Sequence, residues 1–170
     1  MYDDQARAER YYELKRQEGS LIGIISRLTS ERNSVQRQLD DLKKKQEELK
    51  QKIEKYKAMD SQISSLISSV SGVKGNLSSA KGSLSKLMKG NRASQCASSI
   101  SSALSKVTSA KWGLDSSHQS ALAKIKKLES DLKILENNIQ QKTNALNNLN
   151  NQISAQEGAL SRVRAALSCL

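Results

Sequence analysis

The stretch IKKLESDLKILENNIQQKTNALNNLNNQI, residues 125–153, shows most clearly how this chain folds. Its apolar residues recur every seven positions, and the series continues to the C-terminus as Ile125, Leu132, Ile139, Leu146, Ile153, Leu160 and Leu167. A second series lies three residues later, interrupted by Lys142 and Gln156, at Leu128, Leu135, Leu149, Val163 and Leu170. Heptads sustained over this length are typical of a coiled-coil helix.

The first half of the chain has the same seven-residue period. Eleven consecutive positions match it, namely Leu14, Leu21, Leu28, Val35, Leu42, Leu49, Tyr56, Ile63, Val70, Leu77 and Leu84. A second series lies four residues after the first, at Ile25, Leu39 and Ile53, and then changes to three residues after it, at Met59, Leu66, Val73, Ala80 and Leu87. The changed spacing predicts that the buried face of the helix rotates near residues 56–60.

The composition supports a helical fold without a large globular core. The 170 residues include no Pro, and only 3% are aromatic. A globular core usually relies on the bulk of aromatic side chains, so this chain must rely on its Leu, Ile and Val stripes. We therefore predict an all-α protein, an elongated antiparallel helical hairpin that is coiled-coil-like and has a Ser/Gly-rich, partly broken helical middle.

The middle of the chain differs in composition from the two heptad regions. Residues 61–120 contain 20 Ser, together with Gly72, Gly75, Gly82 and Gly90, and neither residue type favours a helix interior. We predict one domain over residues 1–170, with a first long helix over 1–60, shorter helices over 61–112 and a second long helix over 113–170. A second copy or a partner hairpin would complete a four-helix bundle.

Two short stretches predict the breaks between these helices. In KLMKGNRASQ, residues 86–95, a Lys precedes Gly90-Asn91, as expected of a helix end followed by a turn. In WGLDSSHQ, residues 112–119, Gly113 can end one helix and Asp115 can begin the next as its N-cap. The only Trp of the chain, Trp112, would then brace this second break by burying its indole.

Charge is distributed unevenly along the chain. Residues 58–112 carry seven basic residues against Asp60 alone, a balance of +6 within the total of +11. The two ends have mixed charge, which is typical of solvated helices. The basic middle could meet an acidic partner surface or a nucleic acid, although it lacks the aromatic residues on which bases stack.

No group of residues predicts catalysis or ligand binding. His118 is the only His, so a His-based triad or a multi-His metal site is excluded. Paired carboxylates such as Asp40-Asp41 stand beside Lys43 to Lys45, as expected of a solvated helix face. Cys96 and Cys169 do not form a disulfide framework. We expect no enzyme, no cofactor, no metal site and no small-molecule ligand.

The sequence also bounds where the protein is expected to act. The N-terminal stretch MYDDQARAERYYELKRQ has no apolar region of the kind found in a signal peptide. The chain has no apolar run long enough for a transmembrane helix. We expect a cytoplasmic protein, or one that is secreted without a signal peptide.

Two longer stretches carry a family resemblance. RYYELKRQEGSLIGIISRLTSERNSVQRQL, residues 10–39, looks like the first helix of WXG-type proteins of type VII secretion, and KWGLDSSHQSALAKIKKLESDLKILENNIQQKTNALNNLNNQI, residues 111–153, resembles their Trp-Gly turn and second helix. Within this type, the chain resembles in particular the small helical proteins encoded with LXG toxins in Gram-positive bacteria. The family motif is Trp-any-Gly, whereas Gly113 follows Trp112 directly here.

The resemblance extends to a short export element. The family carries Tyr-x-x-x-Asp/Glu, and Tyr56 and Asp60 have this spacing. In the family the element usually follows the second helix, whereas here it lies in the first half of the chain. The resemblance thus implies an export role for these two residues.

We therefore expect a non-enzymatic helical adaptor or chaperone. It would bind the helical N-terminal domain of a type VII-secreted LXG toxin, bury its heptad stripes against that partner and aid export. The residues expected to contribute are Trp112 and Gly113 at the turn, and the stripe residues Leu21, Leu28, Leu42, Leu49, Ile125, Leu132, Ile139 and Leu146. The alternatives are a self-associating structural coiled coil and, third, a basic nucleic-acid-binding protein.

Overall fold

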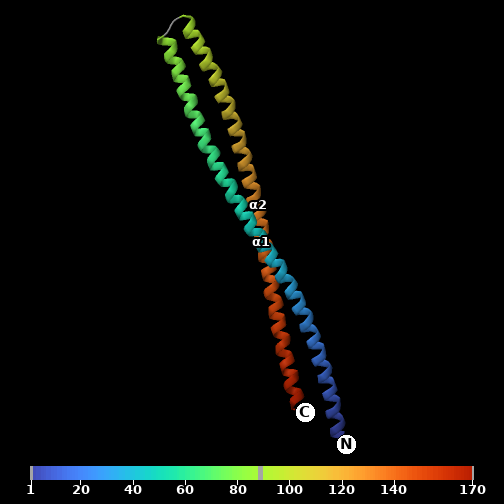
Figure 1. The fold of residues 1–170 in the computed structure, drawn as a ribbon. Helices are drawn as coiled ribbons and strands as arrows, with labels where there is room; N and C mark the ends of the chain where they lie inside the picture. Colours follow the sequence, from blue (N-terminus) through green and yellow to red (C-terminus); the bar gives the residue numbers. More distant parts are fainter. Residues whose placement is uncertain (1, 88–89, 170) are drawn as a thin grey trace. The chain divides into compact units, whose positions relative to one another are not determined.

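The computed structural model describes residues 2–87 and 90–169, and these form two helices (Figure 1). Helix α1 spans Tyr2–Leu87 and helix α2 spans Asn91–Ser168. The two helices pack against each other, and no strand occurs among the described residues. The predicted all-α helical hairpin is therefore confirmed.

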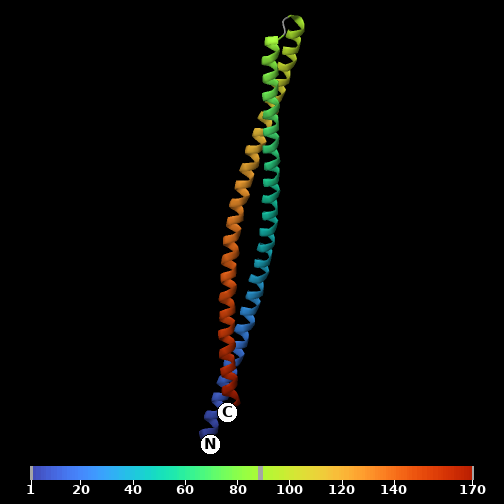
Figure 2. The ribbon, with the colours of Figure 1, turned by 90° about the vertical axis from the view of Figure 1, so that its left-hand side faces the viewer.

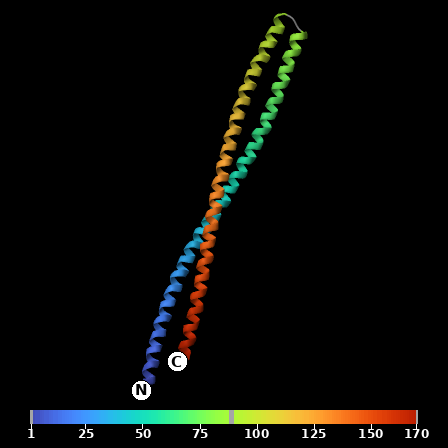
Figure 3. The same ribbon diagram turned by 180° about the vertical axis from the view of Figure 1, so that it is seen from behind.

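The chain divides into two compact units, each built from one segment of α1 and one of α2. We call residues Met1–Glu47 with Lys133–Leu170 the terminal unit, and Glu48–Leu132 the turn unit. In the terminal unit the beginning of α1 lies beside the end of α2, as Figures 2 and 3 show from two directions. In the turn unit the two segments are joined directly by the turn before Asn91.

The seam between the helices follows one regular pattern. On α1 the half-buried and buried residues alternate at spacings of four and three, for example at Leu21, Ile25 and Leu28. On α2 the same alternation begins at Ala93 and continues to Leu167. This is the spacing that keeps one face of a helix turned toward its partner. It passes through the Ser-rich middle on α2, whereas on α1 it skips the exposed Lys81 between Leu77 and Leu84.

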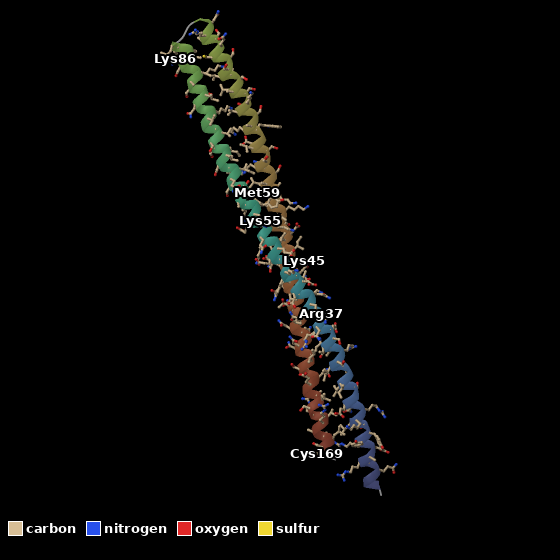
Figure 4. All side chains as sticks on the ribbon, viewed as in Figure 1. Arg37, Lys45, Lys55, Met59, Lys86 and Cys169 are labelled. Atoms are coloured by element: carbon tan, nitrogen blue, oxygen red, sulfur yellow. The ribbon has the colours of Figure 1, made fainter. Side chains whose placement is uncertain are left out.

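The turn lies where KLMKGNRASQ predicts it. Gly90 has a φ of 106°, a left-handed conformation that costs a residue with a Cβ about 1–2 kcal/mol. The carbonyl oxygen of Gly90 accepts a hydrogen bond from the backbone N–H of Ser94 at 3.2 Å, which closes the first turn of α2. Lys86 lies in the last turn of α1 (Figure 4), where its positive charge interacts favourably with the negative end of the helix dipole.

The predicted second break at Trp112–Ser116 is wrong, because α2 continues through it. The carbonyl oxygen of Gly113 accepts a hydrogen bond from the Ser117 hydroxyl at 2.9 Å, and Lys111 pairs with Asp115 at 2.7 Å across the same turn. A single Gly costs a helix only about 1 kcal/mol relative to Ala. Seam residues on both sides of Gly113, among them Leu114, offset that cost by packing against α1.

The predicted shorter helices over residues 61–112 are also wrong, except at the turn itself. Both helices are continuous here, and several Ser hydroxyls donate hydrogen bonds to the carbonyl oxygen four residues earlier, such as Ser65 to Ser61 at 3.0 Å and Ser101 to Ala97 at 2.8 Å. These bonds satisfy the hydroxyls without diverting the backbone from the helix. The second long helix therefore begins at Asn91 rather than at residue 113.

Burial along the seam is uneven. The buried apolar residues lie before residue 54 or after residue 120, and they are Leu28, Leu39, Ile53, Ala121, Ile125, Leu128, Leu149 and Ile153. In the terminal unit Leu28, Leu149 and Ile153 form one cluster, with Ile24 and Val35 packed against it. From residue 54 to residue 120 the described seam residues are at most half-buried. The turn end of the hairpin is thus the more loosely covered part.

Candidate functional site

The predicted rotation of the buried face near residues 56–60 does not occur. Met59, Leu66 and Val73, which were expected to enter the seam, remain 51%, 51% and 49% exposed. The seam instead keeps its alternating spacings of four and three. It continues through Asp60, Ile67 and Lys74, all of them half-buried. The hairpin therefore accepts polar residues into its seam, and it leaves a column of apolar residues outside it.

Asp60 and His118 form a polar layer between the helices of the turn unit. Nδ1 of His118 lies 2.7 Å from Oδ1 of Asp60, and the two side chains are 27% and 17% exposed. Both atoms are inaccessible to solvent, and the contact does not complete a hydrogen bond of good geometry. The short contact joins the two helices, while the incomplete hydrogen bond makes the layer costly for the seam.

The same polar layer shows the setting of the predicted export element. Tyr56 and Asp60 are both half-buried seam residues of α1. Asp60 is directed toward His118 of α2 rather than outward. The Tyr-x-x-x-Asp spacing is thus also the spacing of the heptad seam, and packing between the two helices accounts for both residues.

Beside this layer, an open groove runs between the two helices of the turn unit. Met59 lies at its edge, with Tyr56 and Ile63 from α1. The wall from α2 is formed mostly by small side chains, and its residues are Ser116, Ser117, Ser120, Ala121 and Lys124. The lining is predominantly apolar, and the groove is too open to enclose a small ligand of the kind that buries most of its surface.

The apolar column continues from Met59 toward the turn. It consists of one residue in each successive heptad of α1, at Met59, Leu66, Val73, Ala80 and Leu87, and all five are exposed. A second shallow hollow surrounds Leu66 and is lined otherwise by Ser61, Gln62, Ser65 and Ser69. We call Met59, Leu66, Val73, Ala80 and Leu87 the exposed column. Apolar residues at heptad spacing outside the seam are the kind of surface that a further helix can cover.

Acidic residues are absent from the sequence around the turn. Residues 61–114 contain seven Lys and Arg and no Asp or Glu. The two carboxylates that border this stretch already have basic partners, since Asp60 contacts His118 and Asp115 contacts Lys111. The turn half of the hairpin is thus a cationic surface, which is suited to an acidic partner.

Trp112 stands on the outer surface of α2, where its side chain is 76% exposed. The interpretation of Trp112 as a residue that braces a helix break is therefore wrong, because there is neither a break nor a buried indole. Its neighbour Lys111 occupies the seam position, and the next residue along a helix cannot share that face. An exposed Trp is a residue type enriched at the energetic centres of interfaces.

The predicted partner-binding stripes are occupied by the hairpin itself. Leu28 and Ile125 are buried, and the rest are half-buried in the seam, namely Leu21, Leu42, Leu49, Leu132, Ile139 and Leu146. Their side chains therefore serve first to join α1 to α2. The exposed column and Trp112 are the apolar groups left for another molecule, together with scattered residues such as Ile22 and Ile134.

Ion pairs at the helix surfaces add local electrostatic support. In the terminal unit Glu18 accepts hydrogen bonds from Arg164 at 2.9 Å and from Lys15 at 3.0 Å, and these two bonds lower the pKa of the Glu18 carboxyl. In the turn unit Lys57 donates to Glu129 at 3.0 Å, and this contact raises the pKa of Lys57. Gln46 of α1 donates to Glu136 of α2 at 3.2 Å.

The described residues contain neither a candidate metal cluster nor a candidate membrane span. Across residues 2–87 and 90–169, no three His, Cys, Asp or Glu side chains gather closely enough to hold a metal ion. In that same part of the chain, neither helix contains a stretch with the length and hydropathy of a membrane span. Cys96 and Cys169 are free and exposed, and Figure 4 marks Cys169 near the end of α2.

No family model matches the chain, and neither a curated protein nor a solved structure matches it.

Proposed function

We propose that this chain is a non-enzymatic helical adaptor that binds a helical protein partner. The observation that carries the proposal is the set of apolar side chains that stay exposed after the hairpin has filled its own seam. These exposed side chains include Trp112 and four members of the exposed column, Met59, Leu66, Val73 and Leu87. Covering them would remove apolar surface from water at a gain of roughly 25 cal/mol per Å².

The specific partner that we propose is the helical N-terminal domain of a type VII-secreted LXG toxin, which the adaptor would keep folded and aid in export. The support for this partner is the sequence resemblance of residues 10–39 and 111–153 to the proteins encoded with such toxins. Trp112 and Gly113 lie inside α2 and do not form the turn that the resemblance implies. The support from this element is therefore limited to its sequence.

The localisation and export route are part of the same proposal. The adaptor would act in the cytoplasm, or leave it with the toxin through the secretion machine. A receptor that reads Tyr56 and Asp60 would have to do so at the edge of the seam, because both side chains are half-buried there. Tyr56→Phe should preserve the seam and Tyr56→Ala should loosen it, so a defect in export with both variants would support a direct reading of the Tyr56 hydroxyl.

The proposal is tested by co-expressing the chain with the N-terminal helical domain of an LXG toxin and isolating the complex by an affinity tag on the toxin domain. We expect the unmodified chain to co-purify, and Trp112→Ala to weaken retention while leaving helicity unchanged. Ile134→Ala, also at an exposed apolar residue, is the matched control. Failure of the unmodified chain to bind any such domain would contradict the toxin partner.

A self-associating structural coiled coil is the second candidate function. The exposed column could pair with the same column of another copy, since heptad stripes are the surfaces by which coiled coils assemble. Sedimentation of the purified chain distinguishes the two functions. A stable dimer or larger assembly at micromolar concentration would favour the structural coiled coil.

Nucleic-acid binding is the third candidate, and the acid-free stretch 61–114 is the observation in its favour. Such binding should weaken steeply as salt is raised, because lysines that neutralise phosphates release counterions. We expect no appreciable binding of a random duplex at physiological salt. A tight, strongly salt-dependent complex would place this function first.

A further inference from the structure

The seam of the turn unit has two edges, which are the rows of residues on either side of it. These edges differ in a way that an isolated hairpin does not require. Heptad positions beside the seam are usually charged in coiled coils. On one edge this holds, since Lys57 of α1 pairs with Glu129 of α2. On the other edge α1 carries the exposed column instead, beginning with Met59 at the groove. One edge therefore carries charged side chains suited to solvent, and the other carries apolar side chains that are exposed to solvent.

The facing residues of α2 on this second edge are free of charge from Ser117 toward the turn. Ser117 lines the same groove as Met59. Its heptad column continues toward the turn as Ala110, Ala103 and Cys96, and Ala103 is half-buried. Small side chains on one wall and Met, Leu and Val on the other allow a third helix to approach closely between α1 and α2.

The length of this edge suits a helix rather than a loop or a single side chain. Four heptads separate Met59 from Leu87, which corresponds to about 42 Å along a helix at 1.5 Å per residue. Over this distance the column supplies one apolar contact for every two turns. A partner helix of about four heptads with its own apolar stripe would match the period.

Charge identifies the chemistry of that helix. By the heptad register Lys55 and Lys106 flank the groove edge, Lys127 lies one turn beyond Lys124, and Lys124 itself lines the groove. Figure 4 marks Lys55 one helical turn before Met59 on α1. Of these four lysines only Lys106 lies in the acid-free stretch 61–114, and Asp131 follows Lys127 by one helical turn. From Met59 toward the turn, the groove edge is bordered by the acid-free stretch. A second copy would bring the same basic residues to the groove, and like charges brought together oppose association.

We propose that the groove edge of the turn unit, from Met59 to Leu87, binds an amphipathic helix whose apolar stripe is flanked by Asp and Glu. The inference deepens the proposed function, on which it rests, by naming the face that is used and the kind of helix that fits it. Trp112 is outside this edge, because it follows a seam position on the outer surface of α2. Its contribution to binding is therefore separable from that of the column.

The test uses two labelled synthetic peptides of four heptads with the same Leu stripe, one flanked by Glu and the other by Lys. Binding to the full chain is followed by fluorescence anisotropy. We expect the Glu peptide to bind, to bind less tightly as salt is raised, and to be favoured over the Lys peptide by about tenfold or more, a difference equivalent to 1.4 kcal/mol.

The variant that tests the groove replaces Met59, Leu66 and Val73 by Gln. These side chains are about half exposed, so the variant should keep its helicity and its melting temperature while its affinity for the Glu peptide falls by about tenfold or more. The matched control replaces Ile22, Leu122 and Ile134 by Gln, which are exposed apolar residues outside the edge. The control should bind like the unmodified chain.

Several outcomes would overturn the proposal. Equal binding of the Glu peptide to the groove variant and the control would show that the edge is not the site. Equal binding of the two peptides would remove the acidic partner. Dimerisation that is lost only in the groove variant would assign the edge to a second copy, and displacement of the Glu peptide by a random DNA duplex would assign it to nucleic acid. If the Glu peptide binds while LXG toxin domains do not, the groove stands and the toxin partner falls.

Discussion

The terminal unit and the stretch around the turn are built from the same heptads, yet they use them differently. In the terminal unit Leu28, Leu149 and Ile153 form a buried cluster, and the surface charges are mixed. From residue 54 to residue 120 the described seam residues are at most half-buried, and acidic side chains are absent between residues 61 and 114. The terminal unit therefore holds the two helices together, whereas the stretch around the turn keeps apolar and basic side chains that the hairpin itself does not cover.

The largest expected contrast is between two leucines of α1. Leu28→Ala should lower the free energy of unfolding by about 2–5 kcal/mol, because it opens a cavity in the buried cluster. Leu66→Ala should change it by about 0.5 kcal/mol or less, because the side chain is half exposed and outside the seam. Urea titration followed by circular dichroism measures both. Equal losses would contradict the division between the two regions.

The polar layer of Asp60 and His118 provides the next contrast. His118→Leu alone should destabilise the turn unit by about 1–3 kcal/mol, since it leaves the Asp60 carboxylate half-buried without its partner. Replacement of both residues by Leu should restore the stability of the unmodified chain or raise it further, because apolar groups can replace a buried pair at little cost. Thermal melting of the single and double variants at neutral pH is the measurement. A double variant less stable than the unmodified chain would show that the pair stabilises the seam.

Two glycines of the turn unit should respond with opposite signs. Gly90→Ala should cost about 1–2 kcal/mol, because its φ of 106° places a Cβ in the left-handed region. Gly113→Ala should add about 0.5–1 kcal/mol, because Gly113 is helical and an added Cβ meets no atom within 4 Å. Chemical unfolding of both variants decides the matter. A destabilising Gly113→Ala would restore the idea that α2 is interrupted there.

Trp112→Ala should change the melting temperature very little, with an effect of about 0.5 kcal/mol or less, because the indole is 76% exposed. The fluorescence of this single Trp should show the red-shifted emission of a solvated indole. Addition of a partner that covers Trp112 should shift the emission to the blue. A large loss of stability in Trp112→Ala would mean that the indole packs against the hairpin after all.

The smallest expected effects come from the surface ion pairs, and their pH dependence differs between the two units. Hydrogen bonds from Arg164 and Lys15 lower the pKa of Glu18, so its contribution is present above its unfolded-state pKa and is lost as the pH falls through the folded-state pKa. The contact with Glu129 raises the pKa of Lys57, so its contribution is present at lower pH and is lost as the pH rises through the folded-state pKa. Glu18→Gln should flatten the acidic limb of the stability profile and, because Glu18 also raises the pKa of Lys15, part of the alkaline limb. An unchanged acidic limb would contradict this assignment.

The hairpin and most of its seam could be predicted from the sequence, because Leu, Ile and Val at heptad spacing leave a helix one face to bury. Ile125, Leu128 and Ile153 are buried as that pattern requires. Gly90 also marks the turn by its residue type. These features depend on local spacing and backbone conformation, which a single sequence displays directly.

The candidate site could not be predicted in the same way. The apolar spacing changes at Met59 and suggests a rotation, but the seam keeps its register by accepting Asp60 and Lys74. The packing of the whole helix decides this choice, because a rotation would also have to displace the residues on both sides. A signal was present, since the spacing of four from Tyr56 to Asp60 and from Ile63 to Ile67 repeats that of the first helix half. The continuity of α2 through Gly113 could likewise be read from Leu104, Val107 and Leu114, which keep the register of Ile125 and Leu128.

The serines of the turn unit have a consequence for conformational entropy. Several of their hydroxyls are already bonded to carbonyl oxygens of their own helix, as in Ser65 and Ser69. Short side chains of this kind have few rotamers to lose, whereas each Lys, Glu or Gln immobilised at an interface costs about 0.5–1.5 kcal/mol. A helix that docks beside Leu66 would therefore order few side chains on this surface, and more of the gain from apolar burial would remain as affinity.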